Sequence, residues 1–283
     1  MDKILDGKKV AELKSQRLKD FVKNLIDQKK QPHFCVINIG DNAASKVYIR
    51  AKTRMAEKIG ILQENIQLPK TVSEDEVVAL IKKLNADPEI NGVMVQLPAP
   101  DHINVKRLMD TIDPEKDVDC LTPTNIGRLW EGDHFVEPAT AAGIISLLEE
   151  YDIDLTGKKA VIIGRSNIVG KPLAALLLEK NASVSILHSK TDNLSDYTRQ
   201  ADLLVAAVGQ PELVKADMVK PGAIVIDVGI NRIDNHLVGD VAFDEVKEVA
   251  NLITPVPGGV GPLTVESLME QVVKLAKRQD ERR

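Results

Sequence analysis

The sequence predicts an α/β protein of two domains, each built around a mainly parallel sheet. Short apolar strands alternate with stretches of helical apolar spacing, first before residue 100 and again after residue 139. This order is typical of parallel sheets, because parallel strands need a crossover connection. A segment rich in Asp, Pro, Gly and Asn, residues 113–138, separates the two series, and 283 residues make about two domains. We therefore expect domains at residues 1–139 and 140–263, with a last helix, 264–283, that packs back on the first.

The first domain is expected to alternate helices and strands. Apolar spacing predicts helices at 10–26 and 45–59 and strands at 33–40, 65–68 and 92–98. Ser73 and Glu76 have the spacing of a capping box, which predicts the start of another helix. Residues 113–138 are expected to form loops.

The second domain repeats the pattern with more strands. A helix is expected at 139–150 and a long amphipathic helix at 264–277. The expected strands are 160–163, 183–187, 203–207, 223–228 and 252–253. Strands that alternate with helices again predict a mainly parallel sheet.

The composition is that of an ordinary globular protein and excludes several classes. Hydrophobic residues make up 43% of the chain and charged residues 28%, and a net charge of −5 offers no basic surface to nucleic acid or an anionic membrane. The first residues lack the apolar run of a signal peptide, and no stretch approaches the ~18 apolar residues of a membrane span. Two cysteines form neither a disulfide framework nor a CxxC pair, and five histidines lack metal-ligand spacing. We expect a soluble cytoplasmic protein without a metal.

An apolar strand leads into a glycine-bracketed loop and then into an apolar helix at residues 161–180. A helix N-terminus has unpaired N–H groups and a partial positive charge, so it stabilises an anion such as a phosphate. Gly164 allows the tight turn, Gly170 allows close helix packing, and Pro172 suits the first helical turn. Because five residues separate the glycines and Lys171 precedes proline, the loop is not that of an NTPase. It indicates a dinucleotide cradle of altered spacing, the alternative being a purely structural turn.

The end of the next strand indicates which dinucleotide is bound. NAD-binding domains usually have an Asp or Glu there, which accepts hydrogen bonds from the ribose. This chain has His188, Ser189 and Lys190 instead, and Arg165 of the loop adds positive charge. These groups favour a 2′-phosphate, so NADP is the expected cofactor.

Four residues and one segment are candidates for chemistry. Tyr48 and Lys52 lie four apart on one helix face, Gln96 ends a strand, and Asp119 lies on a loop. Residues 254–264, TPVPGGVGPLT, are too rich in Pro and Gly for a plain connector. Each also has an ordinary structural interpretation, such as an exposed lysine, a core tyrosine, a loop-capping aspartate or a tight turn.

These strings closely resemble the bifunctional methylenetetrahydrofolate dehydrogenase/methenyltetrahydrofolate cyclohydrolase family. The shared strings are YxxxK, VQLP, KDVD, GRSNIVGKP, HSKT, KPGAIVIDVGIN and TPVPGGVGP, in the family's order and over nearly the whole chain. The resemblance implies an N-terminal α/β substrate domain and a Rossmann-type NADP-binding domain with a cleft between them. It also implies a homodimer that oxidises 5,10-methylenetetrahydrofolate with NADP⁺ and hydrolyses the methenyl product to 10-formyltetrahydrofolate.

The resemblance assigns roles to single residues. Lys52 matches the catalytic lysine, a proton shuttle whose pKa is lowered by desolvation, and Gln96 matches the glutamine that positions it. Tyr48 matches a catalytic and substrate-binding residue that packs on the substrate rings, and Asp119 matches the aspartate that grips the pterin. The remaining substrate-binding residues are Pro257, Gly258 and Gly259. The implied cofactor-binding residues are Gly164, Arg165, Ser166, Ile168, Gly170, His188, Ser189, Gly229, Ile230 and Asn231.

The chain departs from the family pattern in two places. Gly-Phe-His is common after KDVD, where residues 120–122 are Cys-Leu-Thr, and Pro-Cys-Thr-Pro is common where Pro138 is followed by Ala-Thr-Ala. These changes bear on substrate affinity and on the ratio of the two activities, but they remove no residue with a chemical role. Cys120 is expected to be a passive wall residue rather than a nucleophile.

Three alternatives to the two-step folate enzyme share some of these sequence features. A single-activity relative, either dehydrogenase or cyclohydrolase, stays open. A non-catalytic NADP-binding regulator is disfavoured, because Tyr48, Lys52, Gln96 and Asp119 are all present. Short-chain dehydrogenases also carry YxxxK, but there the motif follows the cofactor loop, whereas here it precedes the loop by more than a hundred residues.

Overall fold

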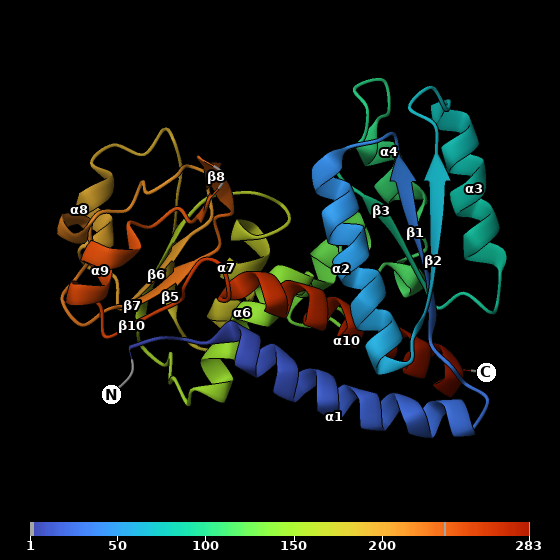
Figure 1. Cartoon of the computed structure of the whole chain (residues 1–283), viewed down its shortest axis with the longest axis horizontal. Coiled ribbons are helices and arrows are strands. Elements are labelled where there is room, and N and C mark those ends of the chain that lie inside the picture. Colours follow the sequence, from blue (N-terminus) through green and yellow to red (C-terminus); the bar gives the residue numbers. More distant parts are fainter. Residues whose placement is uncertain (1–2, 235, 283) are drawn as a thin grey trace. The chain divides into compact units, whose positions relative to one another are not determined.

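The computed structural model describes residues 3–234 and 236–282 and shows an α/β chain that forms two compact units. The three-stranded unit comprises residues 14–138 and 265–282, and the five-stranded unit comprises residues 3–13 and 139–264. Figure 1 shows in each unit a sheet flanked by helices, which confirms the predicted fold class. Two helices, α1 (Gly7–Asp27) and α10 (Val260–Glu281), contribute residues to both units.

The three-stranded unit has the strand order β2-β1-β3, and both neighbouring pairs are parallel. Its elements are β1 (His33–Ile39), α2 (Ala43–Ile59), β2 (Leu62–Leu68), α3 (Glu74–Ala86), β3 (Gly92–Gln96), α4 (Val105–Thr111), the 3₁₀ turn η1 (Pro114–Lys116) and α5 (Pro123–Glu131). A helix follows each strand, so every return to the sheet is a crossover.

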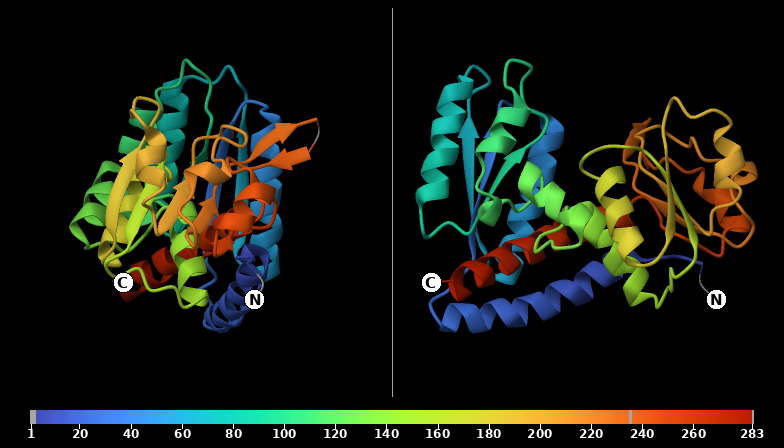
Figure 2. Two further views of the ribbon diagram at one scale, coloured as in Figure 1. Left: turned by 90° about the vertical axis from the view of Figure 1, so that its left-hand side faces the viewer. Right: turned by 180° about the vertical axis from the view of Figure 1, so that it is seen from behind.

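The two faces of this sheet have different neighbours. Cys35 of β1 packs with Val77 of α3 in one buried cluster. Gln96 of β3 points to the other face, because side chains alternate along a strand, and Lys52 of α2 reaches it there. Figures 1 and 2 show α2 and α3 on opposite sides of the sheet.

The five-stranded unit has the order β10-β7-β6-β4-β5 with all neighbours parallel. Its elements are α6 (Ala139–Glu150), β4 (Lys159–Ile163), α7 (Gly170–Glu179), β5 (Ser183–Leu187), α8 (Leu194–Thr198), β6 (Leu203–Ala206), the 3₁₀ turn η2 (Ala216–Met218), β7 (Ile224–Asp227), the hairpin of β8 (Asn231–Ile233) and β9 (His236–Val238), α9 (Phe243–Val249) and β10 (Leu252–Ile253). The chain adds β5 on one side of β4 and all later strands on the other. The order therefore reverses between β4 and β6, and ligands of open α/β sheets bind at the carboxyl ends of strands beside such a reversal.

Residues 3–13 lie with the five-stranded unit, and not with residues 14–138 as the expected 1–139 domain requires. The reason is an edge pairing. Ile4 forms a parallel bridge with Ile253, and the N–H of Leu5 donates to the Ile253 carbonyl at 2.9 Å. The hydroxyl of Tyr151 also accepts from the Asp6 N–H at 2.8 Å.

Several predicted helices are confirmed, and one predicted loop is wrong. Helix α6 has the predicted bounds, and Ser73 and Glu76 form the predicted capping box of α3. The segment 113–138 is not all loop, because it contains α5. Thr122 caps this helix by accepting from the Asn125 N–H.

A buried carboxyl group lies in the three-stranded unit on α10. Glu266 is fully buried, with Lys14 Nζ at 3.8 Å and Glu270 nearby on the same helix. Burial, together with the charge of Glu270, raises the pKa of Glu266 above its ordinary range, and Lys14 opposes that shift. This group therefore ionises less readily in the folded chain than in water.

Candidate active site and cofactor site

Lys52 is a buried lysine held by the sheet beneath it. It lies on α2 with 8% of its surface exposed, and its Nζ donates to Gln96 Oε1 at 2.9 Å and lies 3.6 Å from Met94 Sδ. Gln96 is the last residue of β3, and its Nε2 donates to the Leu97 carbonyl at 2.7 Å, which fixes the amide with its oxygen towards Lys52. Burial lowers the pKa of Lys52, and the charge of Asp119 opposes that shift. The amine thus loses its proton more readily than an exposed lysine does.

Asp119 completes this cluster from a turn after η1. Burial raises the pKa of its carboxyl to about 6, although the charge of Lys52 lowers it, and Asp117 adds to the rise. Its two motif neighbours are structural. Lys116 Nζ donates to the Leu84 and Asp87 carbonyls, and the Asp117 carboxylate accepts from the N–H groups of residues 121 and 122. Two charged residues of the KDVD string, Lys116 and Asp117, thus hold the turn through hydrogen bonds. The third, Asp119, is left to bind a ligand.

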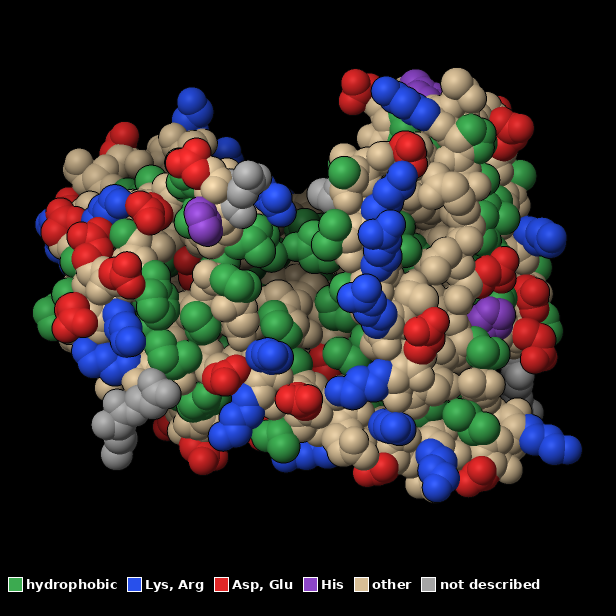
Figure 3. Space-filling model, in the orientation of Figure 1, with side chains coloured by type: hydrophobic (Ala, Val, Ile, Leu, Met, Phe, Trp, Pro, Cys, Tyr) green, Lys and Arg blue, Asp and Glu red, His purple; other side chains and the backbone are tan. Residues whose placement is uncertain are grey.

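Tyr48 lies one turn before Lys52 on α2, as the spacing predicts. Its side chain is 37% exposed, so part of the ring is open to a ligand. Burial of the rest raises the pKa of its hydroxyl, which stays protonated at neutral pH. Figure 3 shows a row of Lys and Arg side chains along this helix, where Lys46, Arg50 and Arg54 are exposed.

The loop from Gly164 to Gly170 in the five-stranded unit can adopt its conformation only because these two residues have no side chain. Gly164 follows β4 with φ +128°, and a Cβ built there would lie 2.2 Å from the carbonyl oxygen of Ala207, which follows β6. A Cβ on Gly170, the first residue of α7, would lie 2.1 Å from the Gly164 carbonyl oxygen. The two glycines thus bring backbone together beside the strand-order reversal between β4 and β6.

The other loop residues divide into caps and exposed groups. Ser166 Oγ accepts from the N–H groups of Val169 at 3.1 Å and Gly170 at 3.4 Å, so it caps the start of α7 from inside the loop. Arg165 and Ile168 are exposed. The Lys171 N–H also donates to the Ser166 carbonyl at 3.1 Å, so N–H groups at the start of the helix that are expected to be unpaired are bonded to a predicted cofactor residue.

The segment after β5 is a tight turn. The His188 N–H donates to Thr191 Oγ1 at 2.9 Å, and His188 Nδ1 accepts from the Lys190 N–H at 3.2 Å. The turn leaves Ser189 and Lys190 exposed and His188 half-buried. Donor groups thus gather at the carboxyl end of β5, next to β4 in the sheet.

Two buried aspartates that no sequence pattern indicates hold the segments that contain Gly229 and Asn231. The Asp227 carboxylate accepts from the N–H groups of Gly229, Asp240 and Val241, and its pKa is raised to about 6 by burial. Asp240 Oδ2 accepts from the N–H groups of residues 208 and 209, and its Oδ1 accepts from Asn231 Nδ2 at 2.9 Å. Asp240 therefore ties together the loops after β6 and β7. Ile230, between these contacts, is 49% exposed.

The Pro/Gly-rich segment is a tight turn before α10 in the five-stranded unit. Gly258 has φ +108°, and the Gly259 N–H donates to the Pro255 carbonyl at 2.8 Å. The Gly258 carbonyl accepts from the Lys8 N–H at 2.9 Å, so the turn is held against the start of α1. Pro257 is exposed. The structure thus brings Lys52, Gln96 and Asp119 together in one unit, whereas this segment and the predicted cofactor residues lie in the other.

Comparison with known proteins decides the family. Residues 5–119 match the catalytic domain of tetrahydrofolate dehydrogenase/cyclohydrolase, and residues 138–280 match its NAD(P)-binding domain. The chain belongs to the tetrahydrofolate dehydrogenase/cyclohydrolase family. Two family members named bifunctional protein FolD are similar over almost their whole length. The one from Lactobacillus delbrueckii subsp. bulgaricus is 66% identical over 279 residues, 99% of each chain, and the one from Lactobacillus helveticus is 63% identical over 282 residues, 100% of each.

Solved structures of the family support the same assignment. The bifunctional FolD of Campylobacter jejuni superimposes with a TM-score of 0.96 at 45% identity, and the match covers 97% of this chain and 98% of that one. The Trypanosoma brucei FolD, solved with NADP and an inhibitor, has a TM-score of 0.92 at 36% identity with 97% of each chain covered. Shikimate dehydrogenase from Thermus thermophilus, at 14% identity and a TM-score of 0.54, shows the fold alone.

Three further observations concern the remaining expectations. None of the helices in the described part of the chain combines the length and apolarity that a bilayer crossing requires. Cys120 is fully buried and its pKa is raised above its ordinary value, chiefly by burial, so it has the properties of a wall residue and not of a thiolate nucleophile. The histidines have no metal-ligand spacing along the chain, but the folded structure brings His33 close to Cys35 and Glu64.

Proposed function

We propose that this chain carries both activities of its family, with NADP as cofactor. It oxidises 5,10-methylenetetrahydrofolate to the methenyl form and hydrolyses that product to 10-formyltetrahydrofolate. The observation that carries the proposal is the environment of Lys52. Its amine is buried and donates a hydrogen bond to Gln96, and burial lowers its pKa. An ordinary ammonium group would repel the cationic methenyl intermediate, whereas a lysine that gives up its proton readily tolerates it. The names of its relatives favour two activities over one.

Asp119 and Tyr48 hold the substrate. The amino-pyrimidine edge of a pterin presents adjacent N–H donors, which a carboxylate accepts in pairs. The Asp119 carboxylate has the charge of Lys52 beside it and is ionised above about pH 6. The partly exposed Tyr48 ring supplies a flat apolar surface on the helix that carries Lys52. We assign Pro257, Gly258 and Gly259 as further folate contacts on the family resemblance.

Hydride transfer needs orientation more than proton transfer. The bridging carbon of the substrate loses hydride with help from the lone pairs of its two nitrogens, so no side chain must act as acid or base. Bound NADP⁺ supplies the hydride acceptor. The residues of the chain contribute by holding the pterin still, which is the role given above to Asp119 and Tyr48.

Hydrolysis does need a proton carrier, and Lys52 is the group in position. Water adds to the methenyl carbon and loses one proton, which leaves a neutral carbinolamine. A carbon–nitrogen bond then breaks as the departing nitrogen gains a proton and the hydroxyl loses its own, so the formyl group forms and one proton is released overall. The amine of Lys52 takes up the first proton and returns one to the nitrogen. The 2.9 Å bond to Gln96 keeps the amine pointed in one direction, so we assign Gln96 as the residue that positions it.

The five-stranded unit fits a dinucleotide. The backbone approach at Gly164 and Gly170 forms a cradle that a single Cβ would fill, as a pyrophosphate site requires. We assign the donors near the carboxyl end of β5, His188 and Ser189, together with the exposed Arg165, to the 2′-phosphate of NADP. The remaining assigned contacts are Ser166, Ile168, Gly229, Ile230 and Asn231.

One assay tests both activities. Purified protein is given methylenetetrahydrofolate and NADP⁺, and the absorbance bands of NADPH and of the methenyl product are followed together. Both bands should rise, and the methenyl band should then decay faster than in buffer. If the methenyl band decays at the buffer rate, the proposal of a cyclohydrolase is wrong. If neither band rises, the proposal of a dehydrogenase is wrong.

We also propose that the chain acts as a homodimer in the cytoplasm. The family resemblance supports the dimer, and the two free cysteines, Cys35 and Cys120, fit a reducing compartment. Light scattering on the purified protein tests the first point, since a mass near 31.0 kDa would mean a monomer. Fractionation of cells that express the chain tests the second.

A further inference from the structure

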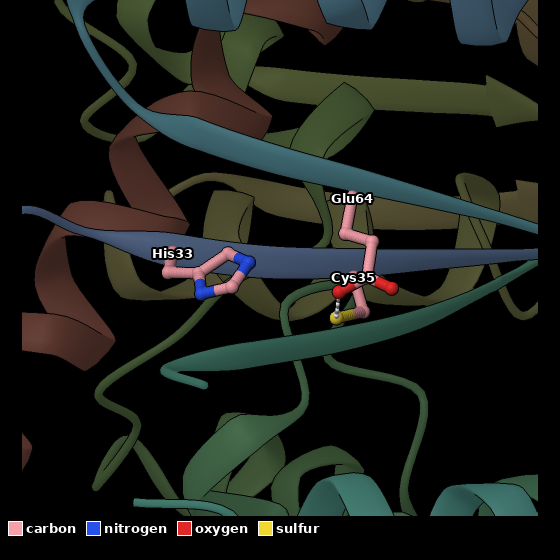
Figure 4. Close-up of side chains that lie close together, drawn as sticks. All are labelled: His33, Cys35 and Glu64. Atoms are coloured by element: carbon pink, nitrogen blue, oxygen red, sulfur yellow. Dashed lines mark hydrogen bonds between the residues drawn. The ribbon is translucent and has the colours of Figure 1, made fainter. Parts of the chain in front are cut away.

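Three metal-ligating side chains lie together on the three-stranded sheet, on the opposite face from Lys52. His33 and Cys35 are two residues apart on β1, and Glu64 on β2 is paired in register with Cys35. Residues two apart on a strand share a face, and partners in a parallel pair lie beside each other. When one ligand atom is taken from each residue, the three atoms all lie within 4.8 Å of one another. Figure 4 shows the Glu64 carboxylate next to the Cys35 thiol and the His33 ring further along β1.

The spacing of these atoms is close to that of a coordination sphere. Zn²⁺ bonds of about 2.0–2.3 Å place tetrahedral ligand atoms about 3.5 Å apart. Cys35 Sγ already lies 3.7 Å from Glu64 Oε2, where the thiol donates a hydrogen bond. The three ligand atoms lie within 4.8 Å of one another, so the His33 ring and the Glu64 carboxylate would have to move closer together to share one ion. Glu64 is exposed and His33 is half-buried, so neither is locked by packing on all sides.

The chemistry of the three donors selects the type of metal. Mg²⁺ and Ca²⁺ take oxygen ligands, and a thiolate with an imidazole disfavours them. A borderline divalent ion accepts a mixture of sulfur, nitrogen and oxygen, with water in the fourth position. Two ligands of charge −1 and a neutral imidazole also leave little residual charge around a +2 ion. Nearby Asp87 adds negative charge, and Lys116 opposes it.

We propose that His33, Cys35 and Glu64 form a Zn²⁺ site that ties the edge strand β2 to the central strand β1. The bond formed is a zinc–thiolate bond, and the thiol proton of Cys35 goes to solvent. Burial and the neighbouring Glu64 raise the pKa of this thiol to about 12. The thiol must therefore give up a tightly held proton before it can bind the metal. The site lies on the face packed by α3, so it serves the stability of the sheet and takes no part in the reaction.

Cobalt provides the direct test, because a thiolate bound to Co²⁺ gives a charge-transfer band in the near ultraviolet. The full chain, reduced and freed of metal by a chelator, is titrated with Co²⁺ and then with Zn²⁺. We expect one Co²⁺ per chain with the thiolate band, and we expect Zn²⁺ to displace it and to raise the melting temperature. Cys35→Ser should abolish the band, and His33→Gln and Glu64→Gln should each weaken Zn²⁺ binding at least about tenfold.

The other cysteine is a matched control. Cys120 is also fully buried and lies in the same unit, so Cys120→Ser should keep both the band and the affinity. Circular dichroism shows which variants are folded, and Glu64→Gln changes an exposed side chain, so it carries the test should Cys35→Ser not fold. The proposal is overturned by a thiolate band that survives in folded Cys35→Ser, by one that disappears in Cys120→Ser, or by Zn²⁺ affinity unchanged in Glu64→Gln.

Discussion

The two units prepare for chemistry in different ways. In the three-stranded unit, burial lowers the pKa of Lys52 and raises that of Asp119, so both side chains are less readily charged than in water. In the five-stranded unit, the corresponding features are places without a side chain, such as Gly164 and Gly170, where backbone atoms meet. The three-stranded unit thus contributes side chains that can ionise, and the five-stranded unit contributes a close approach of backbone atoms.

This difference predicts what each unit tolerates. A site made of titratable groups should lose one step of a reaction when a single side chain is changed, with binding elsewhere intact. A site made of backbone should be insensitive to many side-chain changes yet fail when one methyl group is added. The two kinds of failure should also be separable, because hydrolysis of the methenyl compound needs no NADP.

The largest expected effect comes from removing the amine. Lys52→Met should lower the rate of methenyl hydrolysis by about a thousandfold, because general acid–base catalysis contributes about 10²–10⁴-fold. Hydride transfer should survive at least in part, since it needs no proton carrier. The two rates are measured in the absorbance assay, with Lys46→Met on the exposed part of the same helix as control. Equal loss of both steps in folded Lys52→Met protein would contradict the assigned role.

The matching experiment in the other unit adds one methyl group. Gly164→Ala places a Cβ against the Ala207 carbonyl at a strained φ, so NADP⁺ affinity should fall by about a hundredfold while hydrolysis of added methenyltetrahydrofolate continues. Gly222→Ala is the control, because Gly222 also has positive φ but no atom within 4 Å of the added Cβ. If Gly222→Ala were equally defective, the cause would be backbone strain and not the close approach.

Substrate binding should follow the ionisation of Asp119. The carboxylate form, which accepts the pterin N–H groups, predominates above its pKa of about 6 and is lost as the pH falls through that value. The kcat/KM for the folate should therefore drop by about tenfold per pH unit below the transition. Asp119→Asn should have a lower and flatter profile over the same range. A wild-type profile without a step near pH 6 would separate Asp119 from substrate binding.

Cofactor preference should depend on the donors near β5. The ratio of kcat/KM for NADP⁺ over NAD⁺ should exceed one, and His188→Ala or Arg165→Ala should each lower it by about tenfold, because each removes a polar contact to a phosphate. Lys171→Ala is the control, since its Nζ is bonded to Asn167 Oδ1 in the same loop. Comparable kcat/KM for the two cofactors in the wild type would contradict the assignment.

The smallest expected effect concerns stability and not the reaction. The folded pKa of Glu266 lies above its ordinary value of 4.5, so the folded chain holds a proton that the unfolded chain releases, and the stability from this proton is lost as the pH rises. Glu266→Gln removes the group, so its melting temperature should gain a few degrees on the wild type between about pH 6 and pH 9. Scanning calorimetry measures the difference. Glu270→Gln, one turn along and more exposed, should show a smaller gain.

The sequence predicted most of the fold because most of it follows from local patterns. The capping box of α3 and the bounds of α6 depend on neighbouring residues alone. Helix α5 was missed although Thr122 and Pro123 are good start signals, because the Asp, Pro and Gly content of the surrounding segment was given more weight. The grouping of residues 3–13 with the five-stranded unit was missed because it depends on a pairing between Ile4 and Ile253.

The residues of the candidate site also divide into those that sequence patterns indicate and those that depend on contacts between distant parts of the chain. Lys52 and Gln96 were found through family strings, and the structure adds the bond between them. Asp240 was missed because it accepts hydrogen bonds from residues 208 and 209 in one loop and from Asn231 at the start of β8, and no local pattern connects these positions. His33 and Cys35 had a usable signal, since a spacing of two on a predicted strand puts both on one face, but the third ligand-type group required the pairing of β1 with β2.

The pairing of Ile4 with Ile253 has a consequence for biosynthesis. Ile4 and Ile253 lie far apart along the chain, so the edge of the larger sheet cannot be completed until the whole stretch between them has left the ribosome. Contacts of such high sequence separation slow folding. The smaller sheet draws its three strands from residues 33–96 and is complete much earlier. Nascent chains stalled at increasing lengths should therefore acquire the three-stranded sheet long before they acquire the completed five-stranded sheet.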